Sequence, residues 1–401
     1  MKPAINCYVL IAQQLWALNL GSNARNIAVE LSHTHKVMYV NPALDINTLV
    51  KNLNKAKGWQ RLQLALGIKQ NTQQVAPNLW VHTPATIGIS INWLNNVKLF
   101  NTINRFNAFT FCLSLKKALK LLNWKKEELA VFNDSQMFTG RFVKKYIAPS
   151  KNFYYIRDNL VHHPYFKKHG VRIEPQTIQQ ADAIFANSSY LADYAKQFNQ
   201  NSYDIGQGCE VEMYDASINH QQPADLDRIP YPRIGYAGFL TGERLDICLL
   251  ENLAIEKPLW HFVLIGPEEI MFQQSKLHQL PNVHFLGSKK GSELPAYLQH
   301  VDVCINPQLV NELTIGNYPR KIDEYLALGK PTVATNTPAM QMFLPHVYLA
   351  VGVAGYIHAL QQALKPVENN QKTAAIQFAS SHTWQACIHH IIQYQNNIVS
   401  A

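Results

Sequence analysis

The chain of 401 residues lacks any long hydrophobic run. None approaches the ~18 apolar residues that a membrane-spanning helix needs. The apolar stretch at the N-terminus, Tyr8 to Ala12, is too short for the core of a signal peptide and ends in two glutamines. We therefore expect a protein that is made and kept in the cytoplasm.

Cysteine is also scarce and scattered. The six cysteines are Cys7, Cys112, Cys209, Cys248, Cys304 and Cys387. Because no two of them form a C-x-x-C pair, the sequence favours neither a zinc site nor a disulfide framework. We interpret most of them as ordinary core residues and expect no metal cofactor.

Charged residues make up only 16% of the chain, against 47% apolar residues, as in a globular protein with ample core. The basic excess is confined to one half. Residues 1–215 hold 24 Lys and Arg against 13 Asp and Glu, whereas the remainder holds 12 against 14. This asymmetry indicates an anionic partner for the first half. The candidates are nucleic acid, a phospholipid surface and a phosphate-bearing acceptor. We do not expect nucleic acid, because no helix-turn-helix, RRM, KH or zinc-finger pattern is present.

Apolar runs alternate with helical patterns along the whole chain. Alternation of this kind predicts an α/β protein with parallel, doubly wound sheets, and the length suggests two domains. In the second half we expect strands at 233–237, 261–266, 282–286, 301–306 and 331–335. In the first half we expect them at 6–11, 36–41, 129–133, 152–156 and 183–186.

Residues 302–335 are the most informative segment. A strand that ends before Pro307 is followed by a polar loop, a short helix from Pro319 to Leu328, Gly329 and a second strand. The loop and the helix start therefore lie at the carboxyl edge of a parallel sheet, where open α/β folds bind ligands.

Three charged residues accompany this helix start. Free N–H groups at a helix start attract anions, and Arg320 and Lys321 add two cations. Glu324 follows one turn later. Cations and amides suit a diphosphate, and a carboxylate suits sugar hydroxyls. The segment thus predicts a pocket for a nucleotide or a nucleotide sugar.

The run PRKIDEYLALGKPTVAT, residues 319–335, resembles the C-terminal motif of retaining GT-B glycosyltransferases of family 4, in particular the teichuronic acid biosynthesis branch. The resemblance implies that Glu324 holds the donor ribose and that nearby basic residues hold the diphosphate. The family has a second Glu eight positions earlier, where this chain has Gly316, so the motif is half present. Asn317 or Glu312 could substitute for it.

A second block, residues 233–267, resembles the same branch. Its first strand runs into a turn at Gly238 to Gly242, and small residues there let a backbone approach a ligand closely. The resemblance implies that this turn faces the donor phosphates and that Arg244 contacts them. The glycines do not form a G-x-G-x-x-G fingerprint.

The resemblance further implies two facing Rossmann-like domains. We expect an acceptor-side domain at 1–216, joined by a C-terminal helix at about 384–401, and a donor domain at 230–383. The polar, proline-rich residues 217–232 form the expected linker.

Five residues of the first half are candidates for the acceptor side or for catalysis. Gly21 and Ser22 precede a helix at 23–32, where they either contact the acceptor or simply form a turn and a helix cap. Asp158, His162 and His163 follow a predicted strand. In distant retaining relatives a histidine from this domain approaches the donor sugar. Helix capping and surface roles are the alternative for all three.

Aromatic and basic residues interleave between Ile91 and Lys126. Such a stretch either lies in a membrane interface or forms a core-facing helix with a solvated basic side. Together with the charge asymmetry, it makes an anionic membrane surface a possible partner.

We therefore expect a glycosyltransferase that moves a sugar from a nucleotide diphosphate donor to a cell-envelope glycan or a lipid-linked acceptor, without a metal. Two alternatives stay open. One is a nucleotide-sugar epimerase with the same fold, and the other is a non-catalytic sugar- or lipid-binding protein.

Overall fold

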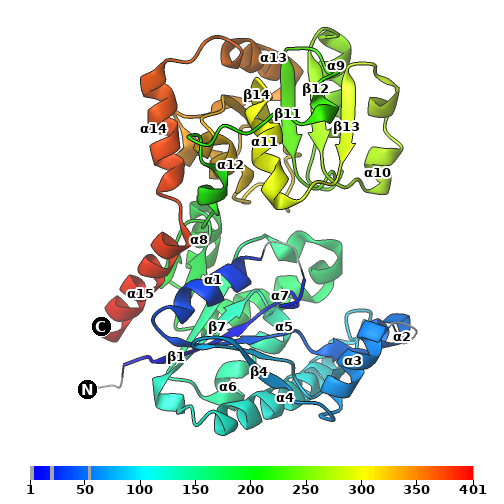
Figure 1. Ribbon diagram of the computed structural model, residues 1–401. Coiled ribbons are helices and arrows are strands. Elements are labelled where there is room, and N and C mark those ends of the chain that lie inside the picture. Colours follow the sequence, from blue (N-terminus) through cyan, green and yellow to red (C-terminus); the bar gives the residue numbers. More distant parts are fainter. Residues whose placement is uncertain (1–3, 19–21, 53–55, 401) are drawn as a thin grey trace. The chain divides into compact units, whose positions relative to one another are not determined.

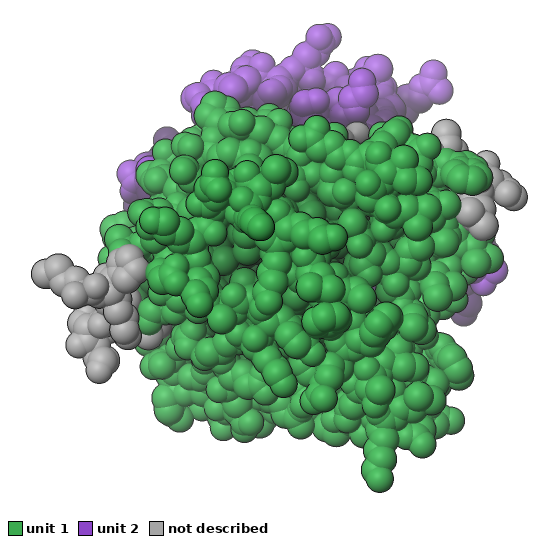
Figure 2. Space-filling model, turned by 90° about the horizontal axis from the view of Figure 1, so that it is seen from below, with its two compact units in different colours: residues 1–206, 388–401 green, residues 207–387 purple. Residues whose placement is uncertain are grey.

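A computed structural model of the chain describes residues 4–18, 22–52 and 56–400. Its contacts divide the chain into two compact units, residues 1–206 with 388–401 and residues 207–387 (Figures 1 and 2). The expected linker, 217–232, lies inside the second unit, and its Leu226 and Ile229 are buried in that unit's core. We describe each unit by itself.

The first unit is built on an eight-stranded sheet of order β10-β9-β8-β7-β1-β2-β5-β4. All neighbours are parallel except the edge strand β4, which pairs antiparallel with β5. The strands are β1 Cys7–Ile11, β2 Lys36–Val40, β4 Thr72–Ala76, β5 Leu79–His82, β7 Leu129–Asp134, β8 Lys151–Ile156, β9 Ala183–Ala186 and β10 Ser202–Asp204. A small separate sheet pairs β3 Leu44–Asp45 with β6 Ile87–Gly88.

Helices cover both faces of this sheet (Figure 1). They are α1 Asn23–Ser32, α2 Ile46–Asn52, α3 Ala56–Ala65, α4 Val97–Leu121, α5 Met137–Gly140, α6 Val143–Ile147, α7 Pro164–Gln180 and α8 Ser189–Lys196. Two apolar clusters fill the space between the sheet and these helices. The last helix, α15 Trp384–Ser400, packs its second half on this unit, where the Tyr8 hydroxyl donates to Gln395 Oε1 at 2.7 Å.

The second unit has a six-stranded, wholly parallel sheet of order β13-β12-β11-β14-β15-β16. Its strands are β11 Arg233–Ala237, β12 His261–Ile265, β13 Val283–Gly287, β14 Val303–Asn306, β15 Thr332–Thr335 and β16 Tyr348–Ala350. Its helices are α9 Ile247–Glu256, α10 Ile270–Gln273, α11 Leu294–Gln299, α12 Lys321–Ala327, α13 Gly352–Ala363 and α14 Asn369–Ser380. The expected strands of this half are confirmed to within two residues at each end.

Alternating residues of the central strands serve the two faces of this second sheet. Ile234 and Tyr236 of β11 join the cluster beneath α9 and α13, whereas Ala237 joins the cluster with α12. The strand order reverses between β11 and β14, which both continue into loops at the carboxyl edge. Such a switch point is where doubly wound sheets bind ligands.

Candidate donor site in the second unit

Two glycines bring the ends of β11 and β12 close together. Gly238 has φ +150°, and a Cβ there would lie 2.6 Å from Lys321 Nζ. Gly266 has φ +151°, and a Cβ there would lie 1.8 Å from the Gly238 carbonyl oxygen. At Gly266 the contact is with backbone, so a side chain cannot be accommodated. At Gly238 the nearest atom ends a flexible side chain, and it is the positive φ that favours glycine. The predicted site residue Gly238 thus leaves room for the Lys321 amine.

Lys321 reaches across to the Tyr236 side chain. Its ammonium lies 3.7 Å from the centre of the Tyr236 ring and hydrogen-bonds to the phenol oxygen. Burial lowers the pKa of Lys321 to about 7; the Glu324 carboxylate opposes this effect, and Arg244 adds to it. The amine is therefore close to half protonated at neutral pH, and an arriving anion would favour its charged form.

Arg244 and Asn317, both predicted from sequence, lie side by side. In the orientation that gives both the oxygen and the nitrogen of its amide a hydrogen-bond partner, Asn317 accepts from Arg244 Nη1 at 2.8 Å and donates to Leu313 O at 3.2 Å. Arg244 follows the glycine-bearing turn, where its N–H donates to Thr241 O at 3.2 Å. The adjacent Asp246 is the N-cap of α9 and accepts from Leu249 N at 2.9 Å.

Glu324 lies one turn into α12, beside its neighbouring cations. Its carboxylate is 3.5 Å from Arg320 Nε and accepts a hydrogen bond from Tyr214. Burial raises the pKa of Glu324, while Arg320 and Lys321 oppose that shift. Tyr214 was not predicted, because it stands more than a hundred positions earlier and no local pattern links it to Glu324.

The expected role of helix amides at this site is not supported. α12 is a short helix, and two of its first N–H groups are already bonded: Ile322 N donates to Pro319 O at 2.9 Å, and Asp323 N donates to Arg320 O at 3.1 Å. The Glu324 N–H also points at Arg320 O. Positive charge at this edge therefore comes from side chains.

Asp323, which the sequence analysis did not select, anchors α12 from within. It is fully buried and accepts hydrogen bonds from Tyr318 Oη at 2.8 Å and Cys209 Sγ at 3.2 Å, and it pairs with His382 Nδ1 at 2.7 Å. These partners come from three separate segments. The next residue, Glu324, is thereby held in place.

Gly316 lies in the loop before α12, where the resembled family has its second Glu. Of the two residues that could substitute for that Glu, Asn317 is buried against Arg244 and Glu312 is exposed.

Asp158, predicted from the sequence, follows the carboxyl end of β8 in the first unit and lies next to Arg157. Arg157 stands between two carboxylates, with Nε 3.0 Å from Asp134 Oδ1 and Nη1 3.5 Å from Asp158 Oδ2. Asp134 ends β7 and is fully buried, and that burial raises its pKa, although Arg157 opposes the shift. Asp134 was missed because it belongs to an apolar strand and carries no motif.

The other first-unit candidates have local roles. Ser22 caps α1 by accepting from Arg25 N at 3.4 Å, and His163 caps α7 by accepting from Tyr165 N at 3.1 Å. His162 lies in the short turn before α7. The neighbouring Asn23 donates to Tyr155 Oη at 3.2 Å, which joins the start of α1 to β8. Gly21 lies outside the described residues.

Possible metal ligands do not cluster in the described part of the chain. Within residues 4–18, 22–52 and 56–400, no three His, Cys, Asp or Glu side chains are placed to hold an ion. Nor does any described helix combine the length and the apolar character needed to cross a bilayer.

The second unit contains a segment that matches a known protein family. Residues 231–365 match the family described as "Glycosyl transferases group 1". The chain is 31% identical over 238 residues to the protein described as "Putative teichuronic acid biosynthesis glycosyltransferase TuaH" of Bacillus subtilis (strain 168). This match covers 55% of the chain and 58% of the relative, so the chain spans little more than half of that relative's length.

Solved structures match almost the whole chain at low identity. Sucrose-phosphate synthase from Thermosynechococcus elongatus has a TM-score of 0.68 at 13% identity, covering 99% of this chain and 100% of its own. Anabaena HepE, in complex with UDP and glucose, has a TM-score of 0.63 at 16% identity, covering 98% and 99%. The predicted fold is thus confirmed: the chain has the GT-B fold, and Gly238, Arg244, Lys321 and Glu324 all lie in the segment that matches the group 1 glycosyltransferases.

Proposed function

We propose that the protein transfers a sugar from a nucleotide diphosphate sugar to a cell-envelope glycan or a lipid-linked acceptor, with retention of anomeric configuration. The observation that carries this proposal is the group formed by Lys321, Arg244 and Glu324 around Gly238 at the β11/β14 switch point. Two cations suit a diphosphate, and a carboxylate suits the two hydroxyls of a ribose. The relative is described as a putative teichuronic acid biosynthesis glycosyltransferase, and the neighbour is described as a complex with UDP and glucose.

In this mechanism the protein stabilises the leaving group. As the bond between the sugar and the diphosphate breaks, negative charge develops on the diphosphate, and Lys321 and Arg244 neutralise it. The acceptor hydroxyl then gives its proton to a diphosphate oxygen on the same face of the sugar. The side chains provide positioning and charge stabilisation, and no strong base or metal is required.

On the acceptor side we assign Asp158 to hydrogen bonding of hydroxyl groups, and His162 remains a candidate beside it. His163 uses its ring nitrogen as a helix cap. Ser22 is the cap of α1, and a role of Gly21 and Ser22 toward the acceptor stays a prediction.

The test is an incubation with a panel of nucleotide sugars and envelope extracts, read out as nucleoside diphosphate release and as the anomeric form of the product. Acceptor-dependent release with retained configuration supports the proposal. Isomerised nucleotide sugar without an acceptor would identify an epimerase. Donor binding with no release in any extract would identify a binding protein.

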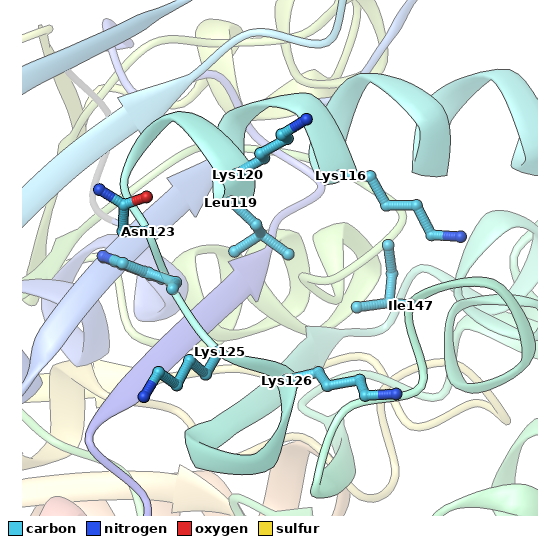
Figure 3. A pocket seen from close by; sticks show the side chains of 8 residues that line it. Lys116, Leu119, Lys120, Asn123, Lys125, Lys126 and Ile147 are labelled. Atoms are coloured by element: carbon cyan, nitrogen blue, oxygen red, sulfur yellow. The ribbon is translucent and has the colours of Figure 1, made fainter.

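We further propose that the first unit docks on an anionic membrane surface at the cytoplasmic face. A hollow of about 460 Å³ lies where α4 ends, and it is rimmed by Lys116, Lys120, Lys125 and Lys126. Figure 3 shows the four lysine side chains spread around Leu119 and Ile147. Because the amines do not converge on one point, they suit several lipid phosphates better than a single phosphate.

The remaining outer face of α4 fits the same partner. Phe106, Phe109 and Leu113 are 54%, 44% and 41% exposed, although they are apolar. The same unit holds three arginines close to one another: burial lowers the pKa of Arg141, and the charges of Arg172 and Arg105 lower it further. Aromatic side chains with flanking cations are typical of surfaces that lie in a membrane interface.

Vesicle co-sedimentation tests this docking. Each lysine near an anionic surface contributes about 1 kcal/mol, so replacing all four by Gln should release most of the protein. Binding should also fall between 0.1 and 1 M salt, as the Debye length shrinks from ~10 to ~3 Å. The matched control replaces four lysines of the second unit, Lys257, Lys276, Lys365 and Lys372. Equal partition into neutral and anionic vesicles, or equal loss in both variants, would refute the docking.

A further inference from the structure

A cavity of about 220 Å³ lies in the first unit, at the carboxyl ends of β1 and β2. The two-residue strands β3 and β6 form part of its wall, and their register places Asp45 opposite Gly88. Both of the paired end residues of this small sheet line the cavity.

The lining combines apolar surface with hydroxyl and amide groups. Ile11, Phe111 and Phe138 provide apolar walls, while Ser90, Gln136 and Thr139 add polar groups. Asp45 is the one charged side chain among the lining residues, all of which belong to the described part of the chain. Arg61 is close enough for the Asp45 charge to raise its pKa, but it does not line the cavity.

Asp45 is held as a carboxylate. Its Oδ1 accepts from Thr48 N at 3.0 Å and from Ser90 Oγ at 3.1 Å, and the Thr48 hydroxyl donates to Oδ2. Burial would raise the pKa of Asp45, but these hydrogen bonds outweigh burial and lower it. Oδ2 has room for a further donor. The cavity therefore presents a negative charge that attracts hydroxyl groups and repels phosphates.

We propose that this cavity binds a single ring of an uncharged sugar. A volume below the ~300 Å³ of ordinary ligand pockets admits one ring. The carboxylate and the neighbouring hydroxyls suit sugar hydroxyls, and the aromatic walls suit the apolar face of the ring. The assignment of this cavity to an acceptor sugar rests on the proposed glycosyl transfer. Its capacity to bind a sugar does not depend on that proposal.

The experiment is saturation-transfer NMR on the full chain with methyl glycosides of neutral sugars and of uronic acids, a sugar phosphate and an octyl glycoside. We expect saturation of the ring protons of one or more neutral glycosides and none for the charged sugars. Asp45→Asn should weaken binding roughly tenfold, as expected for loss of a charged hydrogen-bond acceptor. Asp193→Asn, which removes an exposed carboxylate of the same unit, is the matched control and should change nothing.

A second pair of variants tests the cavity itself. A Cβ at Gly88 meets nothing closer than Leu44 O at 3.9 Å, so Gly88→Ala should fold and bind, whereas Gly88→Leu should fill the space and abolish binding. Preference for a uronate or a sugar phosphate, saturation only of alkyl protons, or equal binding by Gly88→Leu would overturn the inference. Nucleotide binding, measured separately by thermal shift, reports on the donor site, so failure of the proposed function is distinguishable from failure here.

Discussion

The carboxyl edges of the two parallel sheets carry opposite charge. In the second unit, the cations Arg244, Arg320 and Lys321 lie around the carboxylate of Glu324. In the first unit, Asp134 and Asp158 flank the single guanidinium of Arg157. Sheets of the same type thus end in sites of different chemistry. The cationic edge suits a diphosphate, and the anionic edge suits hydroxyl groups, which is the division that transfer from a nucleotide sugar to a glycan requires.

The comparison also shows that the net charge of a unit does not indicate the charge at the carboxyl edge of its sheet. The whole basic excess of the chain lies in its first half, yet the carboxyl edge of that unit is acidic. Its lysines instead rim the hollow that precedes β7 and β8, at the amino ends of those strands. Charge counted over a domain indicates that an anionic partner exists, but it does not indicate on which side of the sheet that partner binds.

We expect the largest effect from a substitution that removes a cation from the carboxyl edge of the second unit. Lys321→Gln should lower the turnover number by about 10²–10³-fold, because it removes a preorganised charge from the departing diphosphate. Nucleoside diphosphate release under saturating donor measures this loss. Lys330→Gln is a matched control, since Lys330 is also a partly buried lysine of this unit but donates to Val301 O at 2.8 Å, away from the switch point. A similar loss of turnover in both variants would mean that the effect arises from folding.

The next prediction uses the lowered pKa of Lys321. Its pKa is about 7 in the free protein, and a bound diphosphate should raise it. Binding then takes up a proton, so affinity should be highest below pH 7 and fall by up to tenfold per pH unit above it, until the pKa of the complex is reached. A nucleotide sugar is the appropriate ligand, because its diphosphate is a diester that does not titrate in this range. Lys321→Gln should bind weakly and show a flat profile; a slope retained in that variant would assign the proton to another group.

A smaller effect is expected at Glu324. Glu324→Gln keeps the shape of the side chain but loses charge-assisted hydrogen bonds worth roughly 1.5–3 kcal/mol, so donor affinity should fall at least tenfold. The sharper measurement compares ribose and 2′-deoxyribose donors. The wild type should bind the ribose donor more tightly than the 2′-deoxyribose donor, and Glu324→Gln should bind both equally. Equal discrimination by both proteins would contradict the assignment of ribose binding to Glu324.

Arg244→Gln should weaken only the binding of the ligand's phosphate groups. Affinity for a nucleoside diphosphate should fall several-fold, while affinity for the nucleoside should stay unchanged, since Arg244 lies beside the glycine turn and Asn317. Isothermal titration with both ligands measures the difference. Equal losses for the two ligands would place Arg244 in folding or in base recognition.

How far these sites could be predicted depends on how local their causes are. The strand–loop–helix order around 302–335, the Ser22 cap and the bounds of α1 follow from neighbouring residues, and the sequence predicts them. The Tyr214–Glu324 bond, the Asp323 anchor and the Asp134–Arg157 pair join distant segments, and no periodicity reveals them. The helix-amide site was expected from a helix start, but Pro319 and Arg320 carbonyls already use those amides.

The smallest expected effect tests the anionic edge of the first unit. Asp158 lies 3.5 Å from Arg157, whereas Asp134 lies 3.0 Å from the same guanidinium. Because Asp134 still pairs with Arg157 when the charge of Asp158 is removed, Asp158→Asn should fold. A hydroxyl bound by this carboxylate would lose only part of its hydrogen bonding, because the amide oxygen still accepts. We expect the Michaelis constant for the acceptor to rise by about fivefold, with donor affinity unchanged. Initial rates at varied acceptor and fixed donor measure the first, and nucleotide titration measures the second. A loss of turnover without any change in the acceptor's Michaelis constant would instead give Asp158 a role at the reacting centre, and a loss of donor affinity would contradict the division between the two edges.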